Sequence, residues 1–556
     1  MVASGPRSRP TPTRLAGRYP DTAIVWLLAL IPFGISLMLA ALMPPFWGVD
    51  ERAHAGYVIE LANGNLPRID TEIPDDPSRF PDLSTAIAGW EGIGRQIWVA
   101  NHPPVYYLLS LPFVAVADWL GVPTAGLFAM RVINALGVAL TVVVVWWIAR
   151  ELVPGRRTVP LLAAALMASA VTFSRDGAYA YNDGVAGLAS ALCLLVGIRM
   201  LRHGLRRDLL VCATLATTLA AGTKAPALVA VAACTLMAAL AAFVHPAVTQ
   251  PGSTGTGTSD PATTATTGPG TLDPVSTGEG SRPARRWWRA AGAAAVVGGV
   301  PALGFGWFYL RNLYLYGDLT AAGVLLEAFQ RAPRGDLLGF LLDLRLHRRV
   351  FEAMWAHWGY SPQLLPFFDV MVVAALVGWL LLAGAWFSRW RRVSPRRDLK
   401  PRQVVLGWLV MVGHAVLTMV LLLNFYSAGG NISIRYLLPL TPLVMTALAL
   451  GLVRLAELVP ARIPARRDAV TVLAITIAMF VLGVVALRPF IQAVPEARLI
   501  PGLQDPLLDW PAPAAGAVLA IAAAAGVVAL QVHAAWRASR TGEPTAGEHA
   551  TESPAR

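Results

Sequence analysis

The chain has 556 residues, of which 56% are hydrophobic and only 14% are charged, and its formal net charge at pH 7 is +12. This composition excludes an ordinary soluble globular protein and indicates a polytopic membrane protein. The positive charge does not indicate a nucleic-acid partner, because the arginines form short clusters between apolar segments, as they do in the cytoplasmic loops of membrane proteins.

The first apolar segment, from about residue 24 to residue 43, contains no charged residue and is long enough to cross a bilayer. Residues 1–21 carry four arginines, and no convincing cleavage site follows the segment, so we expect an uncleaved anchor with a basic, cytoplasmic N-terminus. The acidic pair Asp50-Glu51 then lies just beyond the outer end of this helix, where carboxylates can stay in contact with water.

Further apolar segments alternate with basic clusters that we assign to the cytoplasm. Together with the first segment they predict an all-α polytopic protein of about twelve transmembrane helices in the cell membrane, with both termini cytoplasmic. The stretch 105–120 is short for a span, and a full crossing there would turn the basic cluster at 150–157 outward, so we expect a re-entrant or juxtamembrane helix. The other expected spans lie near 128–149, 158–174, 178–198, 209–222, 226–246, 290–310, 366–388, 403–424, 435–454, 469–487 and 512–534.

These elements divide the chain into two membrane modules, at 22–246 and 285–534. Residues 247–284 between them are rich in Thr, Gly, Pro and Ser and are predicted to be a disordered cytoplasmic linker. Residues 535–556 are predicted to be a cytoplasmic tail.

Each module has one long outer loop, at 44–104 and at 311–365, with a mixture of apolar, aromatic and charged residues that is typical of amphipathic helices lying on a membrane. We expect a cavity between these loops, beside the acidic pair, with an opening toward lipid. No internal repeat is visible, which counts against a secondary transporter, because the halves of such proteins often show related hydropathy.

The acidic pair allows a structural and a functional interpretation. Asp50 suits the N-cap of a helix and Glu51 its first turn, so neither residue needs a substrate to explain it. On such a helix His54 shares a face with both acids, which makes all three candidates for catalysis or substrate binding. A carboxylate-and-histidine triplet is only a weak metal signal, so we assign no metal-binding residue and leave a divalent metal open as a cofactor.

Other polar residues are expected at the outer ends of helices, and most can be explained without a substrate. His102 could contact lipid headgroups, Asp183 belongs to an Asn-Asp turn, and Lys224 could snorkel to the interface. Arg311 and Arg435 break the positive-inside pattern, which favours a phosphate partner. The candidate substrate-binding residues are therefore His54, His102, Asp183, Lys224, Arg311, Arg435 and Tyr436.

The sequence also bears on how a donor substrate would arrive. No Walker A sequence and no G-x-G-x-x-G motif after a strand occurs in the chain, so the sequence shows no binding motif for a soluble nucleotide donor. Acids and cations at outer helix ends are better suited to a donor that the membrane itself delivers. A lipid-phosphate-linked sugar meets that description.

The order of the polar motifs along the membrane region carries a family resemblance. In order they are Asp50-Glu51 with His54, His102-Pro103-Pro104, Arg131, Asn182-Asp183, Thr223-Lys224, Arg311-Asn312 with Tyr316-Gly317-Asp318, and Arg435-Tyr436-Leu437-Leu438-Pro439. This order resembles the GT-C superfamily of integral-membrane glycosyltransferases, especially the protein O-mannosyltransferases, the aminoarabinose transferases and their uncharacterised bacterial relatives. The usual Lys-Pro-Pro of that superfamily is His-Pro-Pro in this chain.

The resemblance implies a polyprenyl-phosphate-linked sugar as donor, a cell-envelope glycan, lipid or protein as acceptor, and catalysis at the extracytoplasmic face among membrane lipids. It implies that Asp50 is the leading catalytic residue, a general base that takes the proton of the acceptor hydroxyl, with Glu51 as the second candidate. The alternatives are a transporter or flippase of lipid-linked or small polar solutes, and a non-catalytic scaffold with a GT-C-like fold.

Overall fold

The computed structural model describes residues 19–80, 82–245, 283–356, 362–390, 399–461, 464–493 and 505–541. Within these ranges the chain is almost entirely helical, and its one β contact is an isolated bridge between Glu72 and Gln96. Most of the predicted cytoplasmic N-terminus, linker and C-terminal tail lies outside the described residues.

Ten helical segments of the described chain are long and apolar enough to cross a membrane. The helices are α1 (Tyr19–Leu42), α5 (Pro123–Leu152), α8 (Asp183–His203), α10 (Leu228–Val244), α11 (Pro283–Ala294) with α12 (Val300–Tyr316), α16 (Leu365–Trp390), α17 (Leu399–Ser427), α18 (Thr441–Ala456), α19 (Pro464–Ala493) and α20 (Ala512–Thr541). In three of these spans a shorter helix or helical turn leads into the long helix, namely Ala225–Ala227 before α10, α11 before α12, and Ile434–Leu440 before α18.

The described part of the chain thus holds ten such segments where the sequence predicts about twelve. A bent pair, α6 (Thr158–Ala168) and α7 (Val171–Gly177), meets at an angle of 54° and brings the count to eleven if it is one span. The segment expected to span near 209–222 is α9 (Arg207–Ala221), whose 15 residues fall short of the roughly 20 that a span needs. The all-α polytopic fold class is confirmed.

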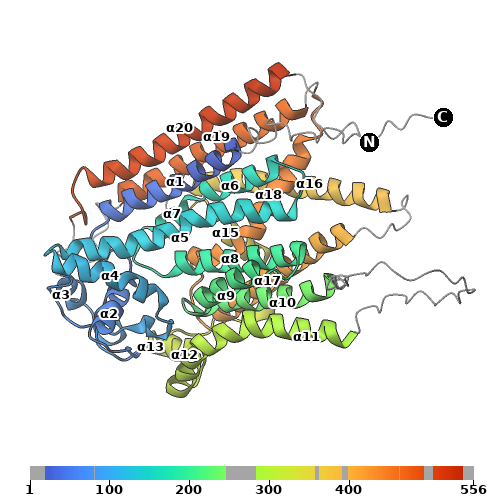
Figure 1. The fold of residues 1–556 in the computed structure, drawn as a ribbon. Helices are drawn as coiled ribbons and strands as arrows, with labels where there is room; N and C mark the ends of the chain where they lie inside the picture. The colour runs from blue at the N-terminus through green and yellow to red at the C-terminus, as the bar shows by residue number, and fades with distance from the viewer. Residues whose placement is uncertain are drawn as a thin grey trace, which may run out of the picture.

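The first outer loop folds into a small helical cap at one end of the bundle, at the left in Figure 1. The loop contains α2 (Glu51–Ala62), α3 (Leu83–Ala88) and the 3₁₀ turns η2 (Gly92–Arg95) and η3 (Trp98–Asn101), and the short apolar helix α4 (Val105–Trp119) that follows the loop completes the cap. The cap has its own apolar core, in which Tyr57 stacks on Tyr107 with ring centroids 3.7 Å apart. This core holds α2 rigidly over the ends of the membrane helices.

The second outer loop also holds short helices, α13 (Ala322–Ala328), α14 (Leu337–Leu342) and α15 (Leu344–Glu352). Leu338, Leu342 and Leu344 are exposed on α14 and at the start of α15. Exposed leucines beside charged residues are typical of helices that lie in a membrane interface, as expected for this loop.

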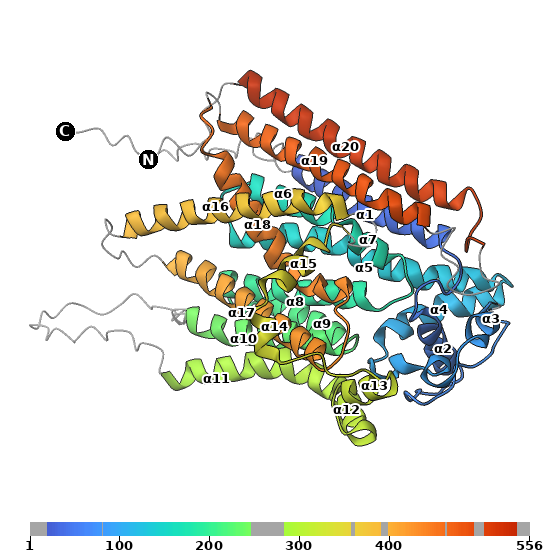
Figure 2. The same ribbon diagram turned by 180° about the vertical axis from the view of Figure 1, so that it is seen from behind.

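Two features of the bundle position the site. First, α5 and α8 approach so closely that a Cβ on Gly184, the second residue of α8, would overlap the backbone carbonyl of Asn134 on α5. Second, the cap lies at the opposite end of the bundle from the ends of α10 and α11 that flank the expected linker (Figures 1 and 2). Asp50, just before α2, and the C-terminal end of α10 are therefore at opposite ends of the apolar bundle.

Candidate functional site

A buried ion pair between Glu51 and Arg131 fixes the start of the cap against the bundle. Both side chains are fully buried, and the guanidinium of Arg131 donates from Nε and Nη2 to the two carboxylate oxygens of Glu51. Each of these hydrogen bonds is 2.8 Å long. Arg131 also donates to the backbone carbonyls of Ala40 and Met43 at the end of α1, and to that of Pro44. All five N–H groups of this arginine are thus in use.

The carboxylate of Glu51 is equally occupied. Besides the two bonds from Arg131, its oxygens accept the backbone N–H groups of Ala180 at 2.7 Å and Gly48 at 3.1 Å. No oxygen of Glu51 is left facing an open space that a substrate could enter, because the side chain is 0% exposed. The geometry therefore suits an anchor that joins α1, α2, α5 and the turn before α8.

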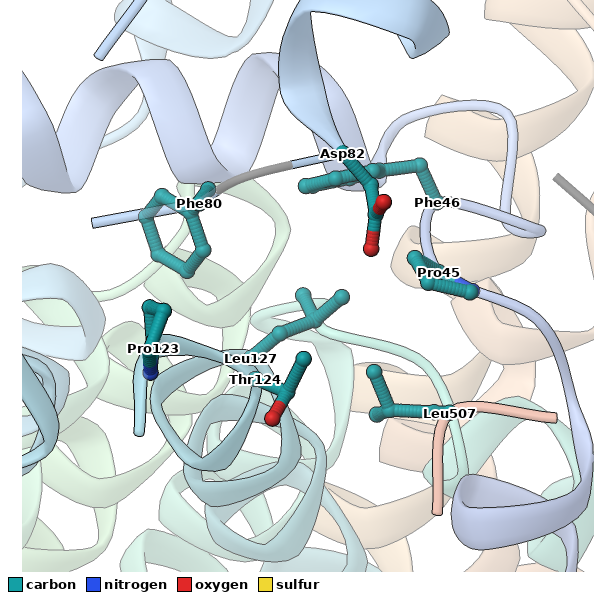
Figure 3. Close-up of a pocket in the computed structure, with 8 residues that line it drawn as sticks. All are labelled: Pro45, Phe46, Phe80, Asp82, Pro123, Thr124, Leu127 and Leu507. Atoms are coloured by element: carbon teal, nitrogen blue, oxygen red, sulfur yellow. The ribbon is translucent and has the colours of Figure 1, made fainter. Parts of the chain in front are cut away.

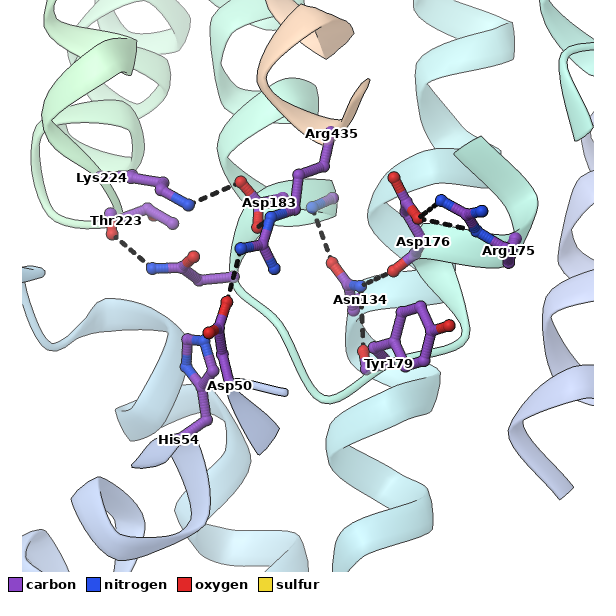
Figure 4. Close-up of polar contacts among 12 residues, drawn as sticks. Asp50, His54, Asn134, Arg175, Asp176, Tyr179, Asp183, Thr223, Lys224 and Arg435 are labelled. Atoms are coloured by element: carbon purple, nitrogen blue, oxygen red, sulfur yellow. Dashed lines mark hydrogen bonds and ion pairs between the residues drawn. The ribbon is translucent and has the colours of Figure 1, made fainter. Parts of the chain in front are cut away.

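Asn134 lies one helical turn after Arg131 on α5 and holds that turn before α8 (Figure 4). Its Nδ2 donates to the backbone carbonyls of Asp176 and Tyr179, and its Oδ1 accepts the N–H of Gly184 at 2.6 Å. Because a side chain at Gly184 would occupy the same space, the close approach of α5 and α8 and the hydrogen bonds of Asn134 depend on each other.

These anchors bring four charged side chains together (Figure 4). Arg435, at the start of the 3₁₀ segment η7 (Ile434–Leu440), donates from Nη2 to Oδ2 of Asp50. Its Nε lies 3.4 Å from Oδ2 of Asp183, the first residue of α8. Lys224, at the break between α9 and α10, donates from Nζ to Oδ1 of Asp183 over 2.6 Å. Residues predicted from the sequence as catalytic or substrate-binding therefore meet in one cluster of two carboxylates and two cations.

Aromatic rings border this cluster. The guanidinium carbon of Arg435 lies 4.2 Å from the centre of the Tyr181 ring, and Nζ of Lys224 lies 5.0 Å from the centre of the Tyr436 ring. Ring faces attract cations and exclude water from one side of them. Tyr436, also predicted from the sequence, thus contributes to the wall of the cluster.

Asp50 occupies the N-cap position of α2, but its side chain makes no capping hydrogen bond. Its side chain is 21% exposed and is held by Arg435, with Nε1 of Trp98 at 3.4 Å. Burial is the largest single influence and raises the pKa of the Asp50 carboxyl, but the charge of Arg435, its hydrogen bond and the other nearby positive charges together outweigh burial, so that the net pKa lies below the ordinary value for Asp. Asp50 is therefore an ionised carboxylate at neutral pH.

His54 and His102 lie beside the charged cluster. Nδ1 of His54 is 3.0 Å from the hydroxyl of Tyr107, and burial lowers the pKa of His54 to about 3, so its ring is neutral. Burial also lowers the pKa of His102, whose buried Nδ1 has no hydrogen-bond partner among the described residues. A neutral histidine with a free ring nitrogen can hydrogen-bond a ligand hydroxyl without adding charge.

Arg311 does not join the four charged residues. Its Nη2 donates to the backbone carbonyl of Pro67 over 2.9 Å, which ties α12 to the first outer loop. The neighbouring Asn312 is fully buried and donates to the carbonyls of Asn101 and Leu319. Both residues of this motif thus hold the cap and the second loop together.

The pocket drawn in Figure 3 lies elsewhere, between the cap and the start of α5. Its cavity volume is about 10 Å³, and it is lined by Pro45, Phe46, Phe80, Asp82, Pro123, Thr124, Leu127 and Leu507. This is room for about one water molecule, far below the roughly 300 Å³ of a typical small-molecule site. This pocket is not the cavity expected beside Asp50, because none of the four charged side chains lines it. Beside Asp50 those four side chains contact one another.

Metal ligation was left open by the sequence. Over the described ranges, no group of three His, Cys, Asp or Glu side chains is arranged to hold a metal ion. Oδ2 of Asp50 is taken by Arg435, and Nδ1 of His54 faces Tyr107. These residues do not fit a divalent cation, and no step below passes through one.

Arg131 and Asn134 are the residues whose importance the sequence did not reveal. In the sequence, Arg131 stands out only as part of the family resemblance, and Asn134 does not stand out. The available signal was a pair of polar residues three positions apart in an otherwise apolar span, since such a pair shares one helix face and needs buried partners.

Comparisons with known proteins give a loose structural likeness. No protein-family model and no curated protein sequence matches the chain. The crystal structure of ArnT from Cupriavidus metallidurans bound to undecaprenyl phosphate is similar at a TM-score of 0.40 and 14% identity, covering 93% of this chain and 77% of that one. The apo state of the same protein gives a TM-score of 0.40 over 92% of this chain.

A second similar structure is the arabinosyltransferase EmbB from Mycobacterium smegmatis, determined by cryo-electron microscopy. It has a TM-score of 0.36 and 14% identity, covering 97% of this chain and 44% of that one. ArnT and EmbB are GT-C glycosyltransferases, the class that the motif order resembles.

Proposed function

We propose that the chain is a membrane glycosyltransferase that moves a sugar from a polyprenyl-phosphate-linked donor to an acceptor hydroxyl at the extracytoplasmic face of the cell membrane. The observation that supports this best is the contact of the ionised, partly exposed carboxylate of Asp50 with the guanidinium of Arg435. The first group can act as a general base and the second can bind phosphate, and glycosyl transfer from a phosphate leaving group needs both.

The reaction would be a single displacement at the anomeric carbon of the sugar. The acceptor oxygen forms a bond to that carbon while the bond from the carbon to the phosphate oxygen breaks. The acceptor's proton passes to Asp50, and the electron pair of the broken bond stays on the phosphate, which gains a negative charge. Cations in contact with that phosphate therefore stabilise the transition state more than the ground state.

The other candidate residues take supporting roles in this proposal. Glu51, which the sequence placed second for catalysis, holds Arg131 and so positions Asp50. Lys224 neutralises Asp183 and keeps it in place beside Arg435. His54 and His102 lie at the edge of the cluster, where they are suited to contact hydroxyl groups of the sugar or the acceptor. The acceptor would be a glycan, lipid or protein of the cell envelope.

Sugar transfer and solute flux separate this proposal from the transporter alternative. Membranes containing the chain should move radiolabelled sugar from a polyprenyl phosphate onto an envelope acceptor, and Arg435→Gln should lose this transfer. Arg68→Gln, which removes an exposed arginine of the first outer loop, should keep the sugar transfer. Flux of labelled donor across sealed vesicles without any covalent transfer would instead identify a transporter or flippase.

A transporter would be expected to carry ionisable residues near the middle of the membrane. The four charged residues lie instead at helix starts and breaks near one end of the bundle, namely Asp50 before α2, Asp183 at the start of α8, Lys224 between α9 and α10, and Arg435 before α18. Their position favours a reaction at one membrane face over passage through the bundle.

A further inference from the structure

Arg435 differs from Arg131 in how much of its hydrogen-bonding capacity is used. Each guanidinium has five N–H groups, and Arg131 directs all of them to protein acceptors. Among the described residues, Arg435 makes one hydrogen bond, from Nη2 to Asp50. Its buried Nε has no hydrogen-bond partner, although the charged oxygen of Asp183 lies 3.4 Å away. Arg435 therefore has donors to spare, and a planar fork of N–H groups matches the oxygens of a phosphate.

The other two candidate cations are less suited to this role. Lys224 and Asp183 form a close pair in which both side chains are at most 8% exposed. Breaking that pair would leave a charge buried without a partner, which is strongly unfavourable. Arg311 donates to the backbone carbonyls of Leu66 and Pro67, and its buried Nη1 has no hydrogen-bond partner among the described residues, but it is not part of the four-residue cluster around Asp50. Of the two cations in the cluster, Arg435 is thus the one that can turn to a ligand with the smaller loss to the fold.

The contact with Arg435 also engages Asp50, the proposed general base. Oδ2 of Asp50 accepts from Arg435, and this arginine is the principal charge that holds the carboxylate in its ionised form. A carboxylate bound to a guanidinium accepts a proton less readily than a free one, because protonation would give up the charge-assisted hydrogen bond. The site as it stands therefore combines a base and a phosphate ligand that block each other.

We propose that Arg435 is a switch between Asp50 and the phosphate of the lipid-linked donor, so that donor binding frees Asp50 to act as the base. The resting cluster is balanced, with the two carboxylates of Asp50 and Asp183 facing the two cations of Arg435 and Lys224. A donor phosphate adds a further negative charge. Arg435 then turns from Asp50 toward the phosphate, and the unpaired carboxylate gains affinity for a proton.

This switch sets the order of events at the site. The donor binds first, Asp50 becomes competent only in its presence, and an acceptor that arrives early meets a carboxylate that is still bound to Arg435. His54 stays neutral and Lys224 stays on Asp183 throughout, so the change is confined to one ion pair. The inference rests on the proposed function, since it assumes that the ligand is a polyprenyl phosphate.

Binding of a short polyprenyl phosphate tests the switch without requiring turnover. Farnesyl phosphate would be titrated by calorimetry into the purified full chain in detergent, with farnesol as the control that lacks the phosphate. The proteins compared are the wild type, Asp50→Asn, Arg435→Gln and the double variant. Asp70→Asn, at a 64% exposed aspartate of the same loop, is the matched control.

If Arg435 is shared, Asp50→Asn removes the competitor and binds farnesyl phosphate more tightly than the wild type, by about 5- to 150-fold, the usual range for coupled sites. The gain must be several-fold smaller in the Arg435→Gln background, where only the repulsion between Asp50 and the phosphate remains to be relieved. A loss or no change of affinity in Asp50→Asn, or an equal gain in both backgrounds, would overturn the switch.

The same samples separate failure of the switch from failure of the proposed function. Farnesyl phosphate binding and sugar transfer in the wild type, without the gain in Asp50→Asn, would sink the switch and leave the glycosyltransferase in place. Absence of both binding and transfer in the wild type would overturn the two proposals together. Unchanged thermal melting of Asp50→Asn and Arg435→Gln shows that affinities are compared between folded proteins.

Discussion

Arg131 and Asn134 lie three positions apart on α5, and each holds one of the two aspartates of the charged cluster in place. Arg131 fixes the residues around Asp50 through Glu51 and the end of α1, and Asn134 fixes the start of α8, which carries Asp183. The segment around Asp50 and the start of α8, which are far apart in the sequence, are thus both held in place by α5. The relative position of the two carboxylates depends on this pair rather than on the carboxylates themselves.

The ion pair between Glu51 and Arg131 leads to a stability prediction. Glu51→Gln leaves a fully buried guanidinium without its counter-charge, which typically costs about 3 to 5 kcal/mol. We expect a lower melting temperature and poor accumulation in the membrane. Glu457→Gln is the matched control, because Glu457 pairs with arginines that are about a third exposed, and such pairs contribute roughly 0 to 1 kcal/mol.

The opposite result for Glu51 is equally informative. A Glu51→Gln protein that melts like the wild type but has lost sugar transfer would return Glu51 to the catalytic role that the sequence allowed.

The contact between α5 and α8 gives a second prediction. Gly184→Ala places a Cβ against the carbonyl of Asn134, so the helices must separate and the hydrogen bond from Gly184 to Asn134 lengthens. Overpacking of this kind typically costs 1 to 3 kcal/mol. Gly304→Ala on α12, where nothing lies within 4 Å of the new Cβ, should be neutral or stabilising. Equal melting temperatures for the two variants would show that α5 and α8 can separate freely.

The meeting of Asp50, Asp183, Lys224 and Arg435 could be expected from the sequence, because all four follow or precede apolar spans on one predicted membrane face. The separate roles of these residues and of their sequence neighbours could not be expected from the sequence. Asp50 and Glu51 are adjacent and share every sequence signal, and only the buried position of Arg131 shows that Glu51 is occupied. Arg311 showed the same signal as Arg435, yet it binds a backbone carbonyl of the first loop. Such contacts depend on tertiary packing that periodicity does not report.

The number of spans illustrates a different limit. Hydropathy marks the segment near 209–222 as apolar, but α9 has 15 residues and ends where the chain turns into the break that carries Lys224. The span predicted near 158–174 is the pair α6 and α7, which is bent by 54°. Composition predicts that a segment is buried in lipid or protein, whereas its length and bends follow from the helices around it.

The sidedness of the bundle gives a third prediction. The cap and the helix ends that flank the linker lie at opposite ends of the bundle, and the arginine clusters predict that the linker end faces the cytoplasm. In a variant without Cys193, Cys212 and Cys234, a cysteine at position 70 should react with an impermeant maleimide in intact cells. A cysteine within 247–284 should react only after permeabilisation. The reverse pattern would overturn the topology and the outer-face chemistry with it.

The buried, neutral ring of His54 makes stability depend on pH. Its pKa is about 3 in the folded protein and 6.5 when unperturbed, so between these values the unfolded chain binds a proton that the folded chain does not. Stability therefore rises with pH through this window and is complete above 6.5. Lowering the pH from 7 to 5 should cost roughly 2 kcal/mol through this residue.

His54→Gln should flatten that pH dependence, since glutamine does not titrate and its amide oxygen can accept from Tyr107. His203→Gln, at a histidine that is 48% exposed, should leave the dependence as in the wild type. Melting temperatures between pH 5 and pH 7 measure both. If His54→Gln and the wild type lose stability in parallel over this range, the penalty belongs to other groups.

Asp50→Asn decides between the helix-cap and the general-base interpretation of Asp50. A cap function does not need the charge, because asparagine caps a helix about as well as aspartate and the Asp50 side chain makes no capping hydrogen bond. An amide cannot take the acceptor's proton. Loss of a general base typically lowers the rate by roughly 10²- to 10⁴-fold, about 3 to 5 kcal/mol of barrier. We therefore expect sugar transfer to collapse while the melting temperature stays near that of the wild type. Asp70→Asn should keep full transfer, and an Asp50→Asn protein that does the same would remove Asp50 from the mechanism.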